Sequence, residues 1–527
     1  MLFANTKVKV VLWLLLAIYA FNVVITAWMC DDAFITYGVA QMFWRGHGLV
    51  YNIGDRVQSY TNPLMLFCMV IIGGITGEGY FSTLLINIAT SLLAFWLVAF
   101  KLCQKDENGD PAHSAVIAPL MLIFSKTYIL LSTSGLENSL EHLLLAIFCW
   151  QLFNVKMWSK KRLYLLCFTA CMLAFCRYDI AILVLPALCY VFFCKAPKDG
   201  TKLGKSALIG TLGILPFVAW EVFCLIYYGF LFPNTAYAKL GGGIPKIEYF
   251  FSGIGYIFAS FMDDIVGIAA IGYVLIIAVI MSTRARRMWR TVSLATGCLF
   301  YLLYVICVGG DFMTGRLLSP LVFVSAVILG RLEVSKVSLA PVVLVFALVC
   351  GIVPNAQYIY KIISESLKIN VYVEADEYAF YSPKTGLLRN FGEWYKGHGF
   401  YQWYLQNKYD VVFVTSASGM PRIAAGDRPH IVDRFALTDA LLARLPAKKT
   451  TNWRSSHLER AIPSGYLETI SIGKNVIEDK NLADYYDKVH TITSTPIFSK
   501  QRFETIVNMN LGKYDYLVDK APYRYRY

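Results

Sequence analysis

Long apolar runs recur along the chain from Val8 to Val353, and they constrain the possible fold more than any other feature. About 20 apolar residues in a helix cross the roughly 30 Å hydrocarbon core of a bilayer, because each residue adds about 1.5 Å. Hydrophobic residues make up 57% of the 527 residues and charged residues only 16%, a balance that soluble proteins of this size rarely show. The sequence therefore predicts an α-helical polytopic membrane protein.

Charge decides which apolar runs are expected to cross the membrane. The eleven predicted spans are residues 8–28, 81–101, 114–131, 139–155, 163–176, 180–194, 207–228, 265–282, 291–308, 317–330 and 338–354. Residues 63–76 are also apolar but short for a span. If they do not cross, the basic clusters between spans fall on the same side as Lys7 and Lys9. The positive-inside rule therefore predicts a helix half-embedded from the outside at 63–76, within a first outer loop at 30–80.

Composition changes towards the carboxyl end of the chain. From Tyr358 onward, charged residues and short alternating runs return, and this segment is long enough to bury a core of its own. We expect residues 1–355 to form the membrane domain and residues 356–527 to form a small extracytoplasmic α/β domain. Its predicted elements are strands at residues 410–415 and 430–434 and a short capped helix at 438–445.

Cysteine and charge usage exclude several kinds of site. All 13 cysteines lie at or before Cys350, so the tail holds no disulfide framework or cysteine metal knuckle. The net charge of +13 is concentrated in short loops between apolar runs, which makes it a topology signal rather than a nucleic-acid signal. The run Gly241-Gly242-Gly243 lacks the strand and helix of a nucleotide-binding turn. We therefore expect no nucleotide-sugar donor, no nucleic acid and no metal.

Two adjacent carboxylates, Asp31 and Asp32, follow the first predicted span at the membrane surface. Acidic residues favour helix N-termini, so one interpretation is that the pair only caps the next helix. A carboxylate can instead take a proton from an attacking hydroxyl, while Arg and Lys neutralise a departing phosphate. Such groups beside a bilayer suit transfer from a lipid-linked donor to an aqueous acceptor. A lipid monophosphate leaving group needs less countercharge than a diphosphate, so fixed cations would suffice without a metal.

The predicted outer segments contribute ten further polar candidates for substrate binding. They are Tyr60, Asn62, Glu137, Arg177, Asp179, Asn234, Lys239, Asp311, Arg316 and His457. Structural alternatives stay open for most of them. Glu137 precedes an apolar helix and can stabilise its N-terminus. Arg177 with Asp179, and Arg316 with Asp311, can be local ion pairs. Lys239 can be a solvated surface charge, and Asn62 before a proline is ordinary turn chemistry.

The order of these motifs resembles a known family. The first outer segment, with Asp31 to Tyr37, Arg45 to Asn52 and Ser59 to Leu64, looks like the first outer loop of GT-C glycosyltransferases related to the mycobacterial terminal arabinofuranosyltransferases. The similarity continues in order through residues 133–137, 177–179, 228–239, 309–316, 433–439 and 457–460. The motifs are individually weak and jointly specific, and they extend over most of the chain.

The resemblance implies a multi-spanning enzyme that uses a polyprenyl-phosphate sugar, commonly polyprenyl-phosphate arabinofuranose, on the outer face of a bacterial inner membrane. By position, Asp31 or Asp32 would be the catalytic base, with Asp31 ranked slightly ahead. The lipid phosphate would depart towards Arg177, Lys239 and Arg316. The acceptor would be an extracytoplasmic glycan or protein, such as arabinan, lipopolysaccharide or a pilin. The tail is shorter than the arabinan-binding modules of related enzymes, which weakens arabinan in particular.

Alternatives from the same class and from other classes remain. The enzyme alternative uses another lipid-linked sugar, such as mannose. A secondary transporter would also have many spans, but transporters place ionisable groups and broken helices near the midplane and show internal repeats, neither of which is evident here. An outer-face receptor would not need acidic and basic motifs spread over six loops.

Overall fold

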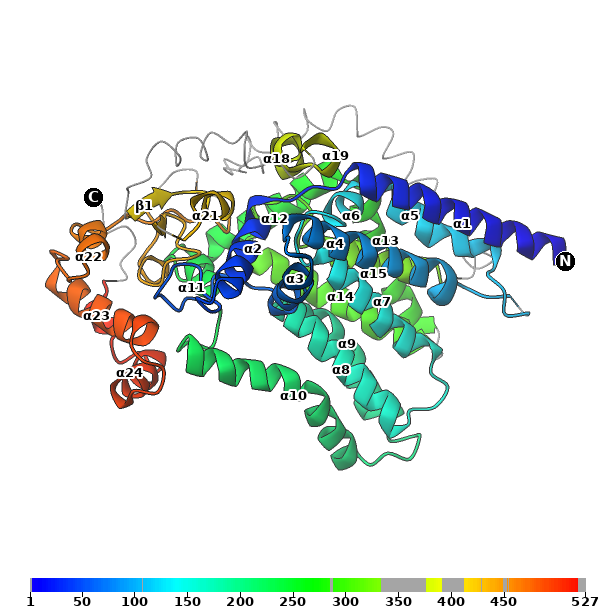
Figure 1. Ribbon diagram of the computed structural model, residues 1–527. Helices are drawn as coiled ribbons and strands as arrows, with labels where there is room; N and C mark the ends of the chain where they lie inside the picture. Colours follow the sequence, from blue (N-terminus) through cyan, green and yellow to red (C-terminus); the bar gives the residue numbers. More distant parts are fainter. Residues whose placement is uncertain are drawn as a thin grey trace. The chain divides into compact units, whose positions relative to one another are not determined.

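A computed structural model of the protein describes residues 2–106, 108–284, 288–332, 376–390, 412–427, 429–448, 453 and 455–519. The chain forms two compact units (Figure 1). The first, called the helical unit, comprises Met1–Trp28, Leu84–Phe217 and Phe250–Phe380. The second, called the mixed unit, comprises Met29–Thr83, Val218–Tyr249 and Tyr381–Tyr527. The predicted domain boundary at 355–356 lies outside the described residues.

The helical unit is built from apolar helices. Its elements are α1 (Leu2–Ile25), α5 (Ile117–Phe124), α6 (Lys126–Leu131), α7 (Asn138–Asn154), α8 (Lys160–Cys176), α9 (Ala181–Tyr190), α13 (Ile265–Arg284), α14 (Trp289–Cys307) and α15 (Ser319–Leu329). Short 3-10 turns lie at His113–Val116 and Tyr178–Ile180, and π-helical turns at Leu97–Leu102 and Val191–Lys195. Four helices contribute residues to both units: α4 (Tyr80–Trp96), α10 (Leu203–Tyr227), α12 (Lys246–Asp263) and α18 (Glu377–Thr385).

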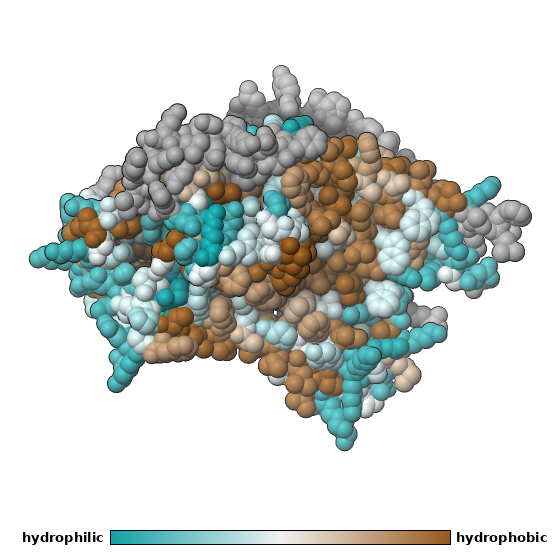
Figure 2. All heavy atoms as spheres, viewed as in Figure 1, coloured by the Kyte–Doolittle hydropathy of each residue, from teal (hydrophilic) through white to brown (hydrophobic). Residues whose placement is uncertain are grey.

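Six helical stretches of the described chain are long and apolar enough to cross a membrane. They are Lys7–Ile25, Tyr80–Leu102, Tyr178–Lys195, Leu203–Tyr227, Ile265–Ser282 and Trp289–Cys307. Large apolar side chains such as Trp13, Leu14 and Phe21 are exposed on the first of them, and apolar side chains cover much of the surface in Figure 2. Such a surface is stable when lipid rather than water covers it. The protein is therefore a helical membrane protein.

The number of spans stays a prediction, and one predicted span is not a continuous helix. Residues 114–131 are divided between α5 and α6 because Ser125 adopts an extended backbone, and its hydroxyl accepts the N–H of Tyr128 to begin the second helix. The predicted span at 317–330 is the short helix α15. The predicted span at 338–354 lies outside the described residues.

Packing in the helical unit depends on small residues where helices cross. α9 packs against α14, and α13 and α15 also pack together. An ideal Cβ placed on Gly297 of α14 would lie 1.7 Å from the carbonyl oxygen of Leu183 on α9. Only glycine permits so close an approach of two backbones. The core around this crossing includes the fully buried Leu294 and Cys298.

The mixed unit combines short helices with a small sheet. Its helices are α2 (Asp31–Trp44), α3 (Pro63–Thr76), α11 (Asn234–Leu240), α19 (Leu387–Asn390), α21 (Gly419–Ala425), α22 (Tyr466–Ile472), α23 (Lys480–Ser494) and α24 (Lys500–Asn510), with 3-10 turns at Leu442–Arg444 and Asp515–Leu517. The helix predicted at 63–76 is confirmed. Pro63 occupies its first turn, where a missing N–H costs nothing, and Gly77 ends it in the left-handed conformation at φ 72°.

Two parallel strands form the sheet of the mixed unit. β1 (Val412–Thr415) pairs with β2 (His430–Asp433), with Val412 opposite His430 and Thr415 opposite Asp433. Both predicted strands are confirmed within the described residues, and α21 connects them. The helix predicted at 438–445 is wrong, because only the 3-10 turn Leu442–Arg444 forms there. Pro446 follows, and a residue before proline avoids the helical region, so Leu445 is extended.

Candidate functional site

The acidic pair begins α2, as one of the two sequence interpretations predicted. The Asp31 carboxylate also makes long-range contacts: Oδ2 accepts the N–H of Gly419 at 3.0 Å, and Oδ1 accepts the N–H of Met420 at 2.8 Å. An ideal Cβ on Gly419 would lie 1.8 Å from the carbonyl oxygen of Asp31. Glycine at this position therefore lets the first turn of α21 approach the first turn of α2. Asp31 and Asp32 are both half-buried.

The environment of Asp31 makes its carboxyl unusually basic. Burial raises the pKa of Asp31 to about 6, and the neighbouring charge of Asp32 adds to this rise, while the N–H groups of Met420 and Gly419 oppose it. A carboxyl with a pKa near 6 is mostly ionised at pH 7 and holds a proton more firmly than an ordinary aspartate. That combination suits a general base at neutral pH.

A second carboxylate, the fully buried Asp433, lies at the end of β2. It accepts the N–H groups of Phe435 and Leu437 at 2.9 and 2.8 Å. Burial raises the pKa of Asp433 to about 6, and the charge of Asp31 contributes to the rise. Sequence reasoning placed this residue in a family motif without giving it a role. The charge of Asp31 thus affects a second acidic residue at this end of the sheet.

A further buried carboxylate, Asp439, lies in the loop that follows β2. It accepts the N–H of Leu442 at 2.8 Å and the hydroxyl of Tyr466 at 2.8 Å. Burial raises the pKa of Asp439 to about 7. Its spacing from Leu442, three residues on, is that of a capping aspartate, and sequence reasoning placed it only within the helix predicted at 438–445.

The raised pKa of Asp439 predicts how stability depends on pH. Because the folded carboxyl holds its proton up to about pH 7 and the unfolded one releases it near pH 4, stability falls as pH rises between these values. We expect the Tm of the wild type to fall from pH 5 to pH 8, and Asp439→Asn to reduce this fall, since its amide can donate to Tyr466 and accept from Leu442. The exposed Asp484→Asn is the control, and equal slopes in all three proteins would contradict the expectation.

Asn234 holds the loop that carries these carboxylates. Its Nδ2 donates to the carbonyl oxygens of Ala436, Leu437 and Asp439 at 2.9, 3.1 and 3.1 Å. Its Oδ1 accepts from the guanidinium of Arg444 at 3.2 Å. Asn234 is buried and orients the loop, and its predicted role in substrate binding stays a prediction. 

The remaining candidates of the mixed unit are Lys239, Tyr60, Asn62 and His457, and the last three have polar or aromatic partners within it. Lys239 is half-buried on α11. The hydroxyls of Tyr60 and Tyr228 lie 2.8 Å apart. Asn62 accepts the hydroxyl of Thr36 at 3.1 Å. His457 packs edge-on against Phe435, with ring centroids 4.7 Å apart.

The helical unit brings five predicted site residues into one buried cluster. Arg177 binds Asp179 through two hydrogen bonds, Nε to Oδ1 at 3.0 Å and Nη2 to Oδ2 at 2.6 Å. Glu137 Oε1 lies 3.6 Å from Arg177 Nη1 and 3.5 Å from Arg316 Nη2. Arg316 Nη1 also lies 3.5 Å from Asp311 Oδ2. All except the half-buried Asp179 are buried. Long-range packing therefore joins segments that the sequence separates by up to 180 residues.

Sequence reasoning missed Glu141 in this cluster. Glu141 lies one turn after Glu137 on α7 and is fully buried, and within the described part of the chain neither of its carboxyl oxygens has a hydrogen-bond partner. Its spacing of four residues from Glu137 was the available signal, because residues i and i+4 share a helix face. The cluster holds four carboxyl groups and two guanidinium groups, so a donor phosphate would have to compete with carboxylates for Arg177 and Arg316.

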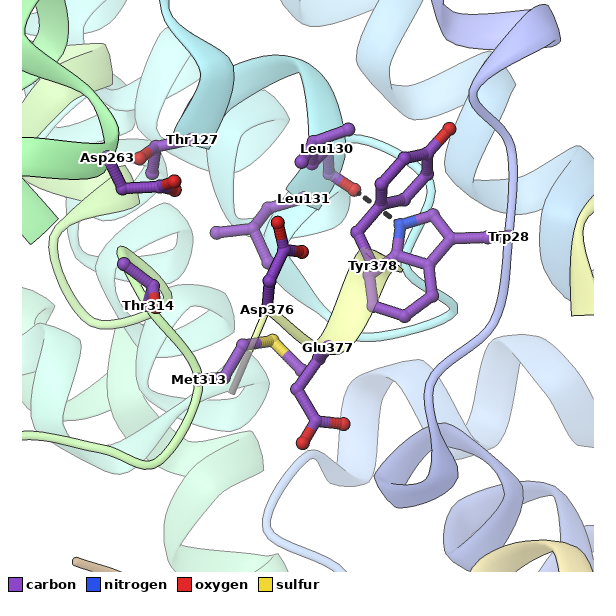
Figure 3. Close-up of a pocket in the computed structure, with 10 residues that line it drawn as sticks. All are labelled: Trp28, Thr127, Leu130, Leu131, Asp263, Met313, Thr314, Asp376, Glu377 and Tyr378. Atoms are coloured by element: carbon purple, nitrogen blue, oxygen red, sulfur yellow. Dashed lines mark hydrogen bonds between the residues drawn. The ribbon is translucent and has the colours of Figure 1, made fainter. Parts of the chain in front are cut away.

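A small pocket lies in the helical unit beside the end of the first span (Figure 3). Its cavity volume is about 30 Å³, far below the roughly 300–1,000 Å³ of small-molecule sites. The indole N–H of Trp28 donates to the carbonyl oxygen of Leu130 at 2.9 Å, and Asp263 and Asp376 share the ammonium of Lys126. This pocket is too small for a sugar. Among the described residues, no group of three or more His, Cys, Asp or Glu could hold a metal ion.

Comparison with known proteins identifies relatives but no structural match. No family model and no solved structure matches the chain. A Mycobacterium tuberculosis protein described as a terminal β-(1→2)-arabinofuranosyltransferase is 26% identical over 227 residues, which cover 41% of this chain and 35% of that protein. A Corynebacterium glutamicum protein with the same description is 25% identical over 343 residues, which cover 55% of this chain and 46% of that protein.

The chain thus spans less than half the length of either of these relatives. The relatives carry the same description as the family whose motifs the outer segments resemble. The partial alignments therefore agree with the resemblance of the ordered motifs. The chain is a helical membrane protein that resembles the terminal β-(1→2)-arabinofuranosyltransferases.

Proposed function

We propose that the protein is a GT-C glycosyltransferase that transfers a pentofuranose, arabinofuranose, from a polyprenyl phosphate to a glycan or protein outside the bacterial inner membrane. The observation that carries the proposal is the similarity to two arabinofuranosyltransferases. The acidic pair directly after the first candidate span supports it, because a base at the membrane surface can serve a lipid-linked donor. In this proposal the membrane domain has eleven spans, and the tail is a periplasmic α/β domain.

Asp31 is the proposed general base. It takes the proton of the acceptor hydroxyl, whose oxygen forms a bond to the anomeric carbon as the bond from that carbon to the phosphate oxygen breaks. The lipid phosphate leaves with the bonding electrons. The two N–H groups that bind Asp31 occupy one lone pair on each carboxylate oxygen, so each oxygen keeps a second lone pair for the proton. Asp32 is the alternative base, and the other predicted residues keep their proposed substrate-binding roles.

Donor choice tests this function directly. Purified full-length protein in detergent is supplied with radiolabelled polyprenyl-phosphate arabinofuranose or polyprenyl-phosphate mannose and with a mixture of envelope glycans. We expect transfer from the arabinose lipid, with release of polyprenyl phosphate. Transfer from the mannose lipid alone would keep the reaction class and overturn the sugar. No turnover of either lipid by folded protein would contradict the transferase and favour the transporter.

A further inference from the structure

The mixed unit contains a cavity that the proposed reaction does not use. It lies among α22, α23, the start of β2 and the loop around Asp55, and its volume is about 370 Å³. Small-molecule sites have volumes of about 300–1,000 Å³, so this cavity can hold part of a ligand of sugar size or larger. α22 and α23 are drawn in orange in Figure 1. Leu441 and Tyr466 line its buried part, and Asp487 and His490 lie on its exposed side.

Aromatic rings form one side of the cavity. Tyr486 and His490 lie four residues apart on α23, and therefore on the same face of this helix. Their rings are parallel within 3°, with centroids 5.7 Å apart. Tyr466 meets Tyr486 edge-on at 5.8 Å. Rings that present an apolar face together with a polar tip suit ligands that are apolar on one face and hydroxylated at the edge, which describes a sugar ring.

Polar groups around the rings supply hydrogen-bond acceptors and donors. Asp55 and Asp487 contribute carboxylates, and His430 contributes a ring nitrogen. Asn475 is held in place by its bonds to the carbonyl oxygen of Ala483 and to Asp487, both at 2.9 Å. Carboxylates accept hydrogen bonds from hydroxyl groups without needing a charged ligand.

The charge of the lining decides between ligand classes. Within the described chain, the residues that line the cavity include carboxylates and histidines but no lysine or arginine. An anionic ligand such as a phosphate or a uronic acid polymer would meet only like charges from Asp55 and Asp487. A neutral polyhydroxylated ligand meets no such repulsion, and its hydroxyl groups can donate hydrogen bonds to these carboxylates.

The cavity is separate from the proposed base. His430, the first residue of β2, lines the cavity. Asp433, whose pKa is raised in part by the charge of Asp31, is the last residue of the same strand. Successive strand residues add about 3.3 Å each, so the two Cα atoms are about 10 Å apart. Side chains at positions 430 and 433 also point to opposite faces of the strand. A ligand in the cavity would therefore not occupy the position of the reacting hydroxyl.

We propose that this cavity binds a neutral oligosaccharide, the non-reacting part of the acceptor glycan. The identity of the ligand as the acceptor rests on the proposed function, whereas the binding itself does not. Contacts away from the reacting centre contribute binding energy without chemistry. The cavity thus sets the affinity for the acceptor and its preferred length.

Equilibrium binding to purified full-length protein tests the proposal, with a linear arabinofuranose pentasaccharide as the probe. We expect Tyr486→Ala to raise the Kd at least about tenfold, and Tyr486→Phe to retain most of the affinity because its ring remains. Tyr516→Ala is the matched control, since Tyr516 is exposed outside the cavity. Failure of the wild type to bind the pentasaccharide, binding of spermidine instead, or equal affinity in all variants would overturn the proposal.

Transfer assays separate this proposal from the proposed function. In an active enzyme, Tyr486→Ala should raise the KM for the pentasaccharide about tenfold with little change in kcat. The reason is that the ground state and the transition state lose the same binding energy. Pentasaccharide binding that depends on Tyr486, in a protein that turns over no lipid donor, would contradict the transferase and keep the glycan site. Transfer by an enzyme whose KM for the acceptor is the same in the wild type and in Tyr486→Ala would keep the transferase and contradict the glycan site.

Discussion

Asp31→Asn is expected to slow transfer by about 10²–10⁴-fold, the usual contribution of general acid–base catalysis. The substitution removes the proton acceptor and keeps a side chain of the same shape, with one oxygen still able to accept the N–H of Met420. The measurement is polyprenyl phosphate release and sugar transfer by purified protein. Asp484→Asn is the matched control, because Asp484 is an exposed carboxylate on α23.

The pH profile distinguishes loss of a base from loss of structure. Since burial raises the pKa of Asp31 to about 6 and the base must be ionised, kcat/KM of the wild type should rise through about pH 6 and then level. Asp31→Asn should lose this rise while unfolding at a temperature close to that of the wild type. If Asp31→Asn retains transfer and Asp32→Asn does not, the base is Asp32. Full activity of both variants would contradict a carboxylate base in this pair.

Gly297→Leu is expected to abolish folded protein, the largest structural effect we predict for the helical unit. The Cβ would lie 1.7 Å from the carbonyl oxygen of Leu183, and a backbone atom cannot move away as the end of a side chain can. α9 and α14 would have to separate, which opens the core around them. Overpacking a core commonly costs about 1–3 kcal/mol, and a clash between two backbones exceeds that range. The measurements are the yield of monodisperse protein and its Tm in detergent.

Gly272→Leu is the control for this prediction. Gly272 lies on α13, and an added Cβ there would meet nothing within 4 Å. Both substitutions add the same side chain to an apolar helix, so they differ only in what surrounds the glycine. Equal yields and equal Tm values for the two variants would show that α9 and α14 do not approach as closely as described.

Local sequence patterns predicted much of the fold. The apolar runs predicted helices, among them residues 63–76, which form α3 with these bounds. The β-branched run before Thr415 predicted β1. One predicted span failed because a local capping interaction interrupted it, and the apolar pattern does not show such an interaction. Ser125 divides a predicted span by capping a second helix.

Local patterns were less informative for the candidate site. They singled out Asp31 and Glu137 by residue type and position, but they did not reveal that Asp31 binds the first turn of α21, 388 residues away. They also missed Glu141. Its spacing of four residues from Glu137 places both on one helix face, but that spacing does not show whether the face is buried. Asp439 was placed only within a predicted short helix, although its tertiary environment makes it a buried acid with a raised pKa.

The sequence by itself therefore determined the class of protein, the helices and the family resemblance, because hydrophobic periodicity and ordered motifs are properties of neighbouring residues. Only the tertiary structure decided which charged groups meet, how deeply they are buried and where a cavity forms. A pKa shift depends on loss of water and on nearby charges, and both are set by segments distant in the chain. The basicity of Asp31 and the ring-lined cavity beside α23 follow from that packing.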